Sequence, residues 1–142
     1  REQEDFETKD GMDVTVCSFN FEAGKLKWSS AVRPLIMYRN GERSFLRGNR
    51  RSVGGDHRDK VFELFEMDIQ KGDVFYMFSD GYPDQFGGPD KKKLKITGLF
   101  EILEEINGLE IEEQERIINS RLMEWQGRHP QTDDILFMAI KI

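Results

Sequence analysis

Two short segments place aspartates beside strongly apolar stretches, and these are the residues that could do chemistry. Ser79-Asp80-Gly81 directly follows VFYMF, and Asp133 and Asp134 directly precede ILFMAI. A carboxylate at the end of a buried strand is costly unless it is solvated, hydrogen-bonded or balanced by a cation. If the two apolar strands are neighbours, Asp80 and Asp133 converge on one rim and could share a hard divalent ion through oxygen ligands. The alternative is that both are ordinary turn residues, because aspartate is also favoured there.

The elements that would position these aspartates follow from the residue pattern. Residues 74–79 are apolar at successive positions, which indicates an interior strand, and residues 135–142 are expected to be buried on both sides as well. The stretch between them begins with a predicted loop over 80–95. Apolar residues at helical spacing then predict a helical hairpin. Its first helix has Thr97 as the cap, Gly108 separates the two helices, and Gly127 ends the second.

The first part of the chain is predicted to be antiparallel β structure. β-Branched and aromatic residues predict the strands, and Asn40-Gly41 predicts a hairpin turn. Arg33-Pro34 interrupts the second strand, since proline cannot donate to a sheet. Three strands on tight turns predict a meander, followed by a polar loop and a further strand. The predicted strands cover residues 13–21, 26–39, 42–46 and 61–67, and the predicted loop covers residues 48–59.

Composition limits the class of protein. The chain has 142 residues and a formal net charge of −6, which argues for one domain and against a nucleic-acid partner. One cysteine excludes an internal disulfide framework, and the apolar runs are too short for a membrane span. We therefore expect a cytoplasmic α+β domain spanning residues 1–142, with polar residues 1–9 as a frayed remnant of an upstream segment.

The order of these segments resembles the metal-dependent PPM family of serine/threonine phosphatases. The bacterial SpoIIE-like branch, which is similar to protein phosphatase 2C in fold, looks closest. The resemblance extends from Lys9 onward and rests on KDGMDVTVCSFNFEAGKLKWSSAVRPLIMYRNG, on GDVFYMFSDG and on TDD before an apolar strand. It implies an antiparallel β-sandwich flanked by helices, in αββα layers.

The resemblance also implies roles for individual residues. Asp80 and Asp133 would be catalytic ligands of one Mn²⁺ or Mg²⁺ ion, Asp134 would support them, and Gly81 would let the backbone pass close to the metal. In the family, water activated by two metal ions attacks the phosphorus of phosphoserine or phosphothreonine. The family's bridging aspartate lies in an earlier Asp-Gly-x-Gly motif, which this sequence lacks. The chain is therefore expected to be a domain incomplete at its N-terminal side, to bind at most one metal and to be inactive alone.

The same resemblance implies a setting in bacterial signalling. SpoIIE-like relatives commonly follow a sensor domain and dephosphorylate small proteins of the anti-anti-sigma-factor type. We expect a cytoplasmic location, within either a soluble or a membrane-bound sensor protein. The alternative is a non-catalytic binding or regulatory module derived from a phosphatase. Because an incomplete sheet leaves exposed edges, a homodimer formed through such an edge is also expected.

Several other residues have both an ordinary and a functional interpretation. Arg33 is read as an exposed charge beside a strand proline, with an approach to substrate phosphate as the alternative. Asp13 is read as a strand-entry residue and Asp84 as a loop residue. The Gly87 to Lys93 loop is read as a mobile surface loop, with a phosphopeptide cradle as the alternative. His57 and His129 stand alone and are not zinc ligands.

Overall fold

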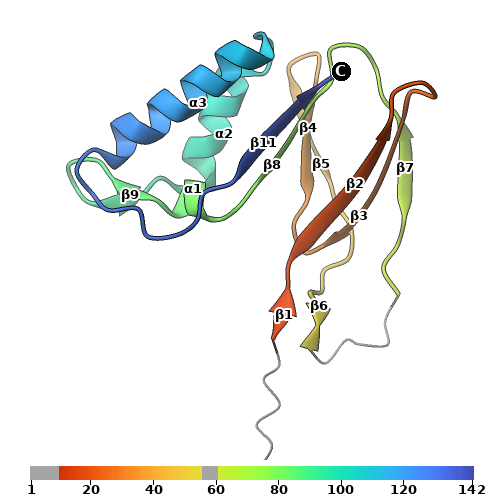
Figure 1. The fold of residues 1–142 in the computed structure, drawn as a ribbon, viewed down its shortest axis with the longest axis horizontal. Helices are drawn as coiled ribbons and strands as arrows, with labels where there is room; N and C mark the ends of the chain where they lie inside the picture. Colours follow the sequence, from red (N-terminus) through yellow and green to blue (C-terminus); the bar gives the residue numbers. More distant parts are fainter. Residues whose placement is uncertain (1–9, 56–60) are drawn as a thin grey trace, which may run out of the picture. The chain divides into compact units, whose positions relative to one another are not determined.

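The computed structural model describes residues 10–55 and 61–142. They form two compact units, which are described separately here and are drawn in Figure 1. One unit consists of the described residues of Arg1–Leu35 and Phe45–Gln70, and the other of Ile36–Ser44 and Lys71–Ile142. Within the described residues, no helix is both long enough and apolar enough to cross a membrane.

The first unit is built on a three-stranded antiparallel sheet. Its strands are β2 (Val14–Asn20), β3 (Lys25–Ala31) and β7 (Phe65–Asp68), in the order β2-β3-β7; β1 (Gly11–Met12) pairs separately with β6 (Val53–Gly54). Burial alternates along these strands because successive side chains point to opposite faces. Leu26 and Trp28 of β3 are buried, and the Trp28 ring stacks on Phe65 with centroids 5.3 Å apart. The predicted strand 61–67 is therefore only partly correct, since pairing begins at Phe65.

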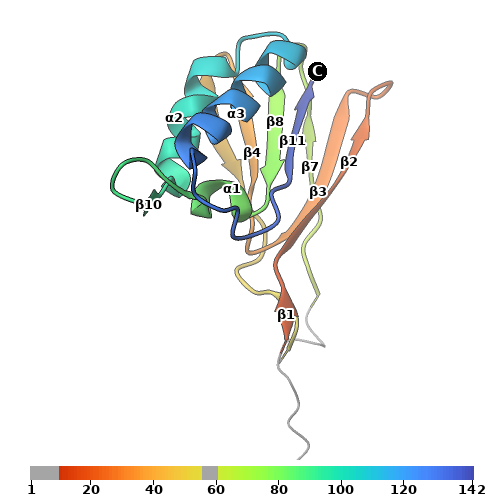
Figure 2. The same cartoon turned by 60° about the vertical axis from the view of Figure 1, so that its left-hand side comes forward.

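The remaining large elements are a four-stranded antiparallel sheet and a helical hairpin. The sheet order is β11 (Phe137–Lys141), β8 (Val74–Phe78), β4 (Leu35–Arg39) and β5 (Glu42–Leu46). Helices α2 (Lys95–Ile106) and α3 (Ile111–Gln126) cover one face of this sheet (Figure 2). The predicted loop 80–95 contains α1 (Gly81–Asp84) and the short paired strands β9 (Phe86–Gly87) and β10 (Lys92–Lys93).

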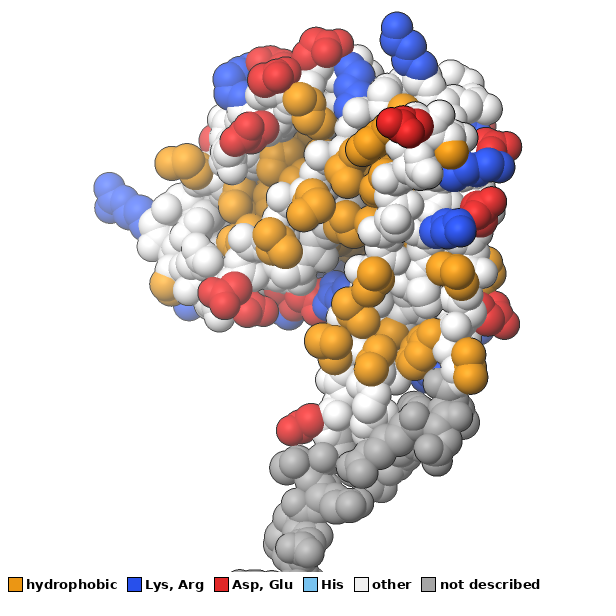
Figure 3. Space-filling model, turned by 45° about the vertical axis from the view of Figure 1, so that its right-hand side comes forward, with side chains coloured by type: hydrophobic (Ala, Val, Ile, Leu, Met, Phe, Trp, Pro, Cys, Tyr) orange, Lys and Arg blue, Asp and Glu red, His pale blue; other side chains and the backbone are white. Residues whose placement is uncertain are grey.

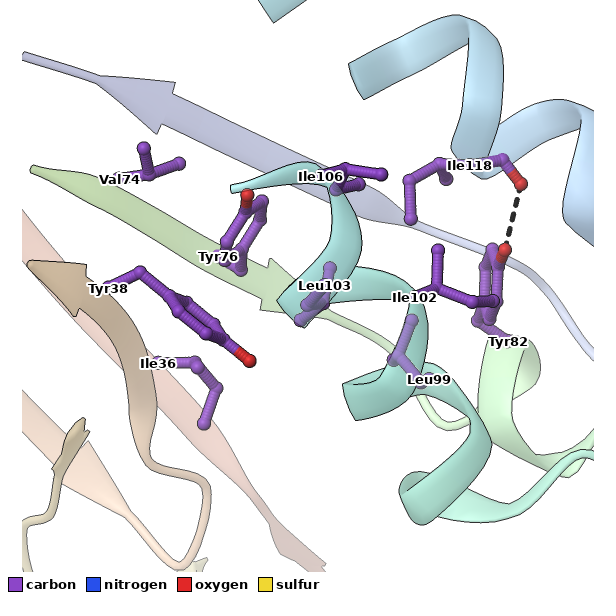
Figure 4. Close-up of a cluster of buried hydrophobic side chains, with 10 residues drawn as sticks. All are labelled: Ile36, Tyr38, Val74, Tyr76, Tyr82, Leu99, Ile102, Leu103, Ile106 and Ile118. Carbon is purple, nitrogen blue, oxygen red and sulfur yellow. Dashed lines mark hydrogen bonds between the residues drawn. The ribbon is translucent and has the colours of Figure 1, made fainter. Parts of the chain in front are cut away.

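The main core lies between this sheet and the helices. Leu99, Ile102, Leu103 and Ile106 form the buried stripe of α2, as expected for an amphipathic helix, and they lie in one cluster with Tyr76 of β8 and Tyr82 (Figure 4). Two buried phenols are anchored by hydrogen bonds to α3. Tyr76 donates to the Gln114 side chain at 2.6 Å, and Tyr82 donates to the Ile118 carbonyl at 2.7 Å. These bonds fix the tilt of α3 over the strands, because a buried hydroxyl without a partner would be costly.

All three tyrosines of the chain belong to this core, which gives a pH prediction. Tyr38, Tyr76 and Tyr82 are at most 1% exposed, and burial raises the pKa of each phenol. A raised folded-state pKa stabilises the fold fully below the ordinary value of about 10, and this contribution is lost as the pH rises through the folded-state pKa. We expect tyrosinate absorbance and loss of circular dichroism to appear together in one alkaline transition. Tyrosinate forming while the circular dichroism stays native would contradict this.

Two strand predictions from the sequence are wrong. The segment 26–39 is not one interrupted strand, because β3 and β4 belong to different sheets, so the first strands do not form a single meander. The chain changes sheets at Val32, whose φ of 69° is unfavourable for a β-branched residue, and at Pro34. The C-terminal strand is also not buried on both sides. It is an edge strand, and Leu136 and Met138 are 62% and 45% exposed.

Two further details differ from the sequence predictions. Thr97 does not cap α2 but lies inside its first turn, since the helix begins at Lys95. The predicted loop 48–59 contains β6, and its residues 56–59 lie outside the described part of the chain. The interior position of β8, the hairpin at Asn40-Gly41 and the end of α3 at Gly127 are confirmed.

Candidate functional site

The two most apolar strands are neighbours, as their sequence predicts. β8 and β11 pair antiparallel with Phe78 opposite Phe137, and the Ser79 amide donates to the Leu136 carbonyl at 2.9 Å. Because the chain leaves β8 where it enters β11, the residues just after Phe78 and just before Phe137 share one end of the pair. Asp80 and Asp133 therefore lie at the same end of the sheet.

The Ser79 side chain joins the two chain segments that carry these aspartates. We call the place where residues 79–81 meet residues 133–136 the aspartate junction. The Ser79 hydroxyl donates to the Asp134 carbonyl at 2.8 Å and accepts from the Leu136 amide at 2.9 Å. Both bonds bridge residues more than 50 positions apart in the sequence. Ser79 was not a predicted functional residue. The only local signal is a hydroxyl next to Asp80, and serine is common at strand ends for other reasons.

Gly81 makes the same junction possible by having no side chain. A Cβ placed there would lie 2.2 Å from the Asp134 carbonyl oxygen, which is far inside van der Waals contact. The family resemblance implies that this glycine lets the backbone pass close to a metal, which stays a prediction. In the structure its closest neighbour is the backbone beside Asp133, so the glycine lets the two aspartate-bearing segments approach each other.

The carboxylates at this junction are exposed to solvent, which removes the cost of burying their charge. Asp133 Oδ1 accepts a hydrogen bond from the Asp134 amide at 2.7 Å, and Gln131 Nε2 donates to the Asp133 carbonyl at 2.8 Å. These bonds hold the turn that precedes β11. The Asp80 carbonyl accepts from the Asp84 amide at 2.9 Å, which begins the short helix α1.

Gln85 connects α1 to the segment that leads to Asp133. Its side chain is buried and donates to the Pro130 carbonyl at 3.0 Å and to the Phe86 carbonyl at 2.9 Å. Its own carbonyl accepts from Trp125 Nε1 at 2.9 Å. Sequence reasoning missed Gln85, because a glutamine in a loop gives no local signal of burial. The consequence is that both sides of the aspartate junction are attached to one hydrogen-bonded frame.

The glycine-rich loop after α1 is packed against the end of α3. A Cβ at Gly87 would lie 1.9 Å from the Trp125 carbonyl oxygen, and the Gly88 amide donates to that carbonyl at 2.9 Å. His129 Nε2 lies 3.3 Å from the Gly88 carbonyl, and Lys93 pairs with Asp84 at 3.2 Å. These contacts give the glycines a packing role in this loop.

The carboxylates of Asp80 and Asp133 are the oxygen donors that the aspartate junction could offer to a metal ion. Among residues 10–55 and 61–142, no three or more His, Cys, Asp or Glu side chains form a group able to hold a metal. Asp80 and Asp133 offer two exposed carboxylates. Mg²⁺ and similar hard ions are often held by one or two carboxylates and several waters, so these donors fit part of such a site.

The layered α+β fold is of the protein phosphatase 2C type, as its similarity to solved structures shows. The chain belongs to the SpoIIE family: the family described as Stage II sporulation protein E (SpoIIE) matches residues 2–142. No match was found among curated proteins. The predicted family and fold class are thus confirmed, and the chain is a PPM-type, phosphatase-family domain.

Solved structures show the same fold. The SiaA-PP2C domain of Pseudomonas aeruginosa is 27% identical with a TM-score of 0.80, and the match covers 93% of this chain and 52% of that one. The phosphatase domain of SpoIIE from Bacillus subtilis is 13% identical with a TM-score of 0.62, covering 92% and 56%. The RsbU and RsbW domains of a Mycobacterium tuberculosis protein are 15% identical with a TM-score of 0.64, covering 91% and 35%. The chain thus spans about half the length of the first two structures.

Proposed function

We propose that this chain supplies part of the active site of a metal-dependent phosphatase that hydrolyses phosphoserine or phosphothreonine in proteins. The observation that carries this proposal is the junction where Ser79 and Gly81 hold the Asp80 and Asp133 segments together at one strand end. Asp80 and Asp133 would hold Mn²⁺ or Mg²⁺, and Asp134 would support their turn through its backbone. A divalent ion, when bound, supplies a Lewis acid that activates water and neutralises phosphate charge.

The chain's own contribution is to hold the two carboxylates in place. The Ser79 hydroxyl and the Gln85 amide fix the backbones on both sides, so little reorganisation is needed when an ion binds. Two carboxylates would hold one ion weakly. We propose that a second ion and turnover require the earlier Asp-Gly-x-Gly segment of a longer protein. The substrate class we propose is a phosphorylated protein of the anti-anti-sigma-factor type, in a cytoplasmic signalling pathway governed by a sensor domain.

Manganese binding tests the site on this chain. Mn²⁺ would be titrated and followed by electron paramagnetic resonance for the unmodified chain, Asp80→Asn and Asp133→Asn, with Asp90→Asn as the matched control. Asp90 is an exposed aspartate that pairs with Lys92 at 3.2 Å. Removing one of two carboxylate ligands is expected to weaken binding by about tenfold or more. Equal affinity for all four proteins would overturn the assignment.

Hydrolysis tests the activity. A longer protein that joins this sequence to an upstream Asp-Gly-x-Gly segment should hydrolyse p-nitrophenyl phosphate with Mn²⁺, and Asp80→Asn should reduce the rate to background. The second candidate function, a non-catalytic module, is favoured by the absence of a third metal ligand among the described residues. Normal Mn²⁺ binding without hydrolysis in the longer protein would support that module.

Self-association through a sheet edge is a further prediction. Figure 3 shows a face of the molecule on which hydrophobic side chains gather at the surface. In the described chain, β11 is an edge strand, and the side chains of Met138 on this strand and of Leu136 just before it are exposed. An unpaired apolar edge favours pairing with another strand, and a charge on the edge opposes it. We propose that the chain forms a homodimer through β11.

Sedimentation velocity at high protein concentration checks this prediction. The unmodified chain is expected to dimerise and Met138→Lys to remain monomeric. The control is Met123→Lys, because Met123 is 72% exposed and belongs to helix α3 rather than to a strand of the sheet. A monomeric unmodified chain, or a dimer that Met138→Lys leaves intact, would contradict dimerisation through β11.

A further inference from the structure

Three arginines line one cavity in the first unit, although the chain as a whole is acidic. Arg33, Arg50 and Arg51 border an open cavity of about 760 Å³ together with Asp13 and Ser52. The chain carries 27 acidic and 21 basic residues, so a concentration of three cations around one carboxylate is a local feature. We call this cavity the arginine pocket.

Asp13 is the one carboxylate among the described lining residues of the arginine pocket, and it has a hydrogen-bond partner of its own. The Ser52 hydroxyl donates to Asp13 Oδ1, which fixes this side chain at the start of β2. Asp13 thus has the strand-entry role that the sequence predicted. Among the described residues that line the pocket, there are three guanidinium groups and one carboxylate.

The backbone that carries Arg33 is held in an unusual conformation. Val32 has a φ of 69°, and the Arg33 amide donates to the Ala31 carbonyl at 2.8 Å, so Val32 is the centre of a tight γ-turn that β-branched residues rarely adopt. The Val32 amide also donates to the Asn49 carbonyl at 2.8 Å, which ties this turn to the residue before Arg50. Arg33 and Arg50 are therefore placed on one rigid frame before any ligand binds.

Arg51 is also held in position and retains an unused donor. Its guanidinium lies over the Phe62 ring, 4.9 Å from the centroid, and donates to the Val61 carbonyl. Its Nε is buried and has no hydrogen-bond partner among the described residues. A buried donor without an acceptor is costly.

We propose that the arginine pocket binds a dianionic phosphate group. Planar guanidinium groups match the oxygen geometry of phosphate and form paired hydrogen bonds to it, and several arginines favour a dianion over a monoanion. Asp80 does not line the pocket, and binding there requires no metal. Phosphate binding by the arginines is therefore independent of the proposed catalytic site. The group can come from free phosphate or from a phosphorylated serine of a protein.

Binding to the full chain tests the proposal. The chain, kept free of metal with EDTA, would be titrated with inorganic phosphate and, separately, with a short phosphoserine peptide, at constant ionic strength and followed by amide NMR signals. Acetate is the monoanion comparison. Saturable shifts around Arg33 and Arg50 are expected with at least one of the two phosphate compounds. Which of the two binds identifies the source of the group.

Substitutions of single arginines test whether these side chains bind the phosphate. Arg50→Gln and Arg33→Gln are each expected to weaken phosphate binding about tenfold, because each removes charge-assisted hydrogen bonds. Arg47→Gln is the matched control, since the Arg47 guanidinium lies 5.1 Å from the Phe45 ring centroid and outside the pocket. Asp80→Asn should bind phosphate normally. Arg50 is exposed, so Arg50→Gln should fold and gives a decisive result even if Arg33→Gln does not fold.

Three results would overturn the proposal. The first is the absence of saturable binding by both phosphate compounds. The second is binding that Arg50→Gln leaves unchanged or that acetate matches. The third is binding that is lost in Asp80→Asn, which would place the anion at the aspartate junction instead.

Discussion

Replacing Gly81 by alanine is expected to separate Asp80 from Asp133 and to weaken Mn²⁺ binding by about tenfold or more, because both carboxylates must reach one ion. The added Cβ would lie 2.2 Å from the Asp134 carbonyl oxygen and 2.8 Å from its carbonyl carbon. Both atoms are backbone, so no side-chain rotation can relieve the contact. Overpacking of this kind typically costs about 1–3 kcal/mol of unfolding free energy.

Two glycine controls separate the loss of the site from a loss of stability. Gly108→Ala should be neutral, because no atom lies within 4 Å of its Cβ position. Gly87→Ala should destabilise the fold, since its Cβ would lie 1.9 Å from the Trp125 carbonyl oxygen, but the folded variant should still bind Mn²⁺. Unfolding by urea and titration with Mn²⁺ measure the two effects. Unchanged Mn²⁺ affinity in Gly81→Ala would show that the close approach at this glycine does not position the metal ligands.

Replacing Arg39 by methionine is expected to cause the largest loss of stability. Asp73 is 1% exposed, and Arg39 binds it through two hydrogen bonds, Nε to Oδ1 at 2.8 Å and a terminal nitrogen to Oδ2 at 2.7 Å. Removing the guanidinium leaves a buried carboxylate without its cation, which typically costs about 3–5 kcal/mol. The pair joins β4 to the start of β8, so unfolding by urea should show the loss directly.

The double variant Arg39→Met/Asp73→Leu should recover most of that stability, because two apolar residues leave no unpaired charge. The surface pair of Arg43 and Glu104, 2.9 Å apart, is the matched control. Glu104 is half exposed, so Glu104→Gln should cost no more than about 1 kcal/mol. Equal losses for Arg39→Met and Glu104→Gln would contradict the view that burial of Asp73 makes its pair important.

Part of the candidate site could be predicted from the sequence, because its aspartates lie close to apolar runs. Asp80 and Asp133 stand beside apolar runs, where a buried carboxylate would be costly, although aspartate is also favoured in turns. The strong apolarity of those runs also predicted that β8 and β11 are neighbours, which the structure confirms. The metal roles of Asp80 and Asp133 stay predictions.

The remaining features required the tertiary structure. Ser79 hydrogen-bonds residues 55 and 57 positions away, and Gly81 contacts the backbone of Asp134, so neither role leaves a local pattern. Apolarity predicted that the C-terminal strand is buried on both sides, but strand order, which depends on pairings distant in sequence, places it at an edge.

The sequence by itself determined the two long helices and most of the longer strands, because side-chain periodicity and turn residues act over a few positions. It also determined the phosphatase-like order of the motifs. Only the tertiary structure decided which sheet each strand joins and that Arg33 meets Arg50 and Arg51 in one pocket. The physical reason is that these arrangements depend on strand pairing and close packing between distant residues, and no local property of the chain specifies that pairing.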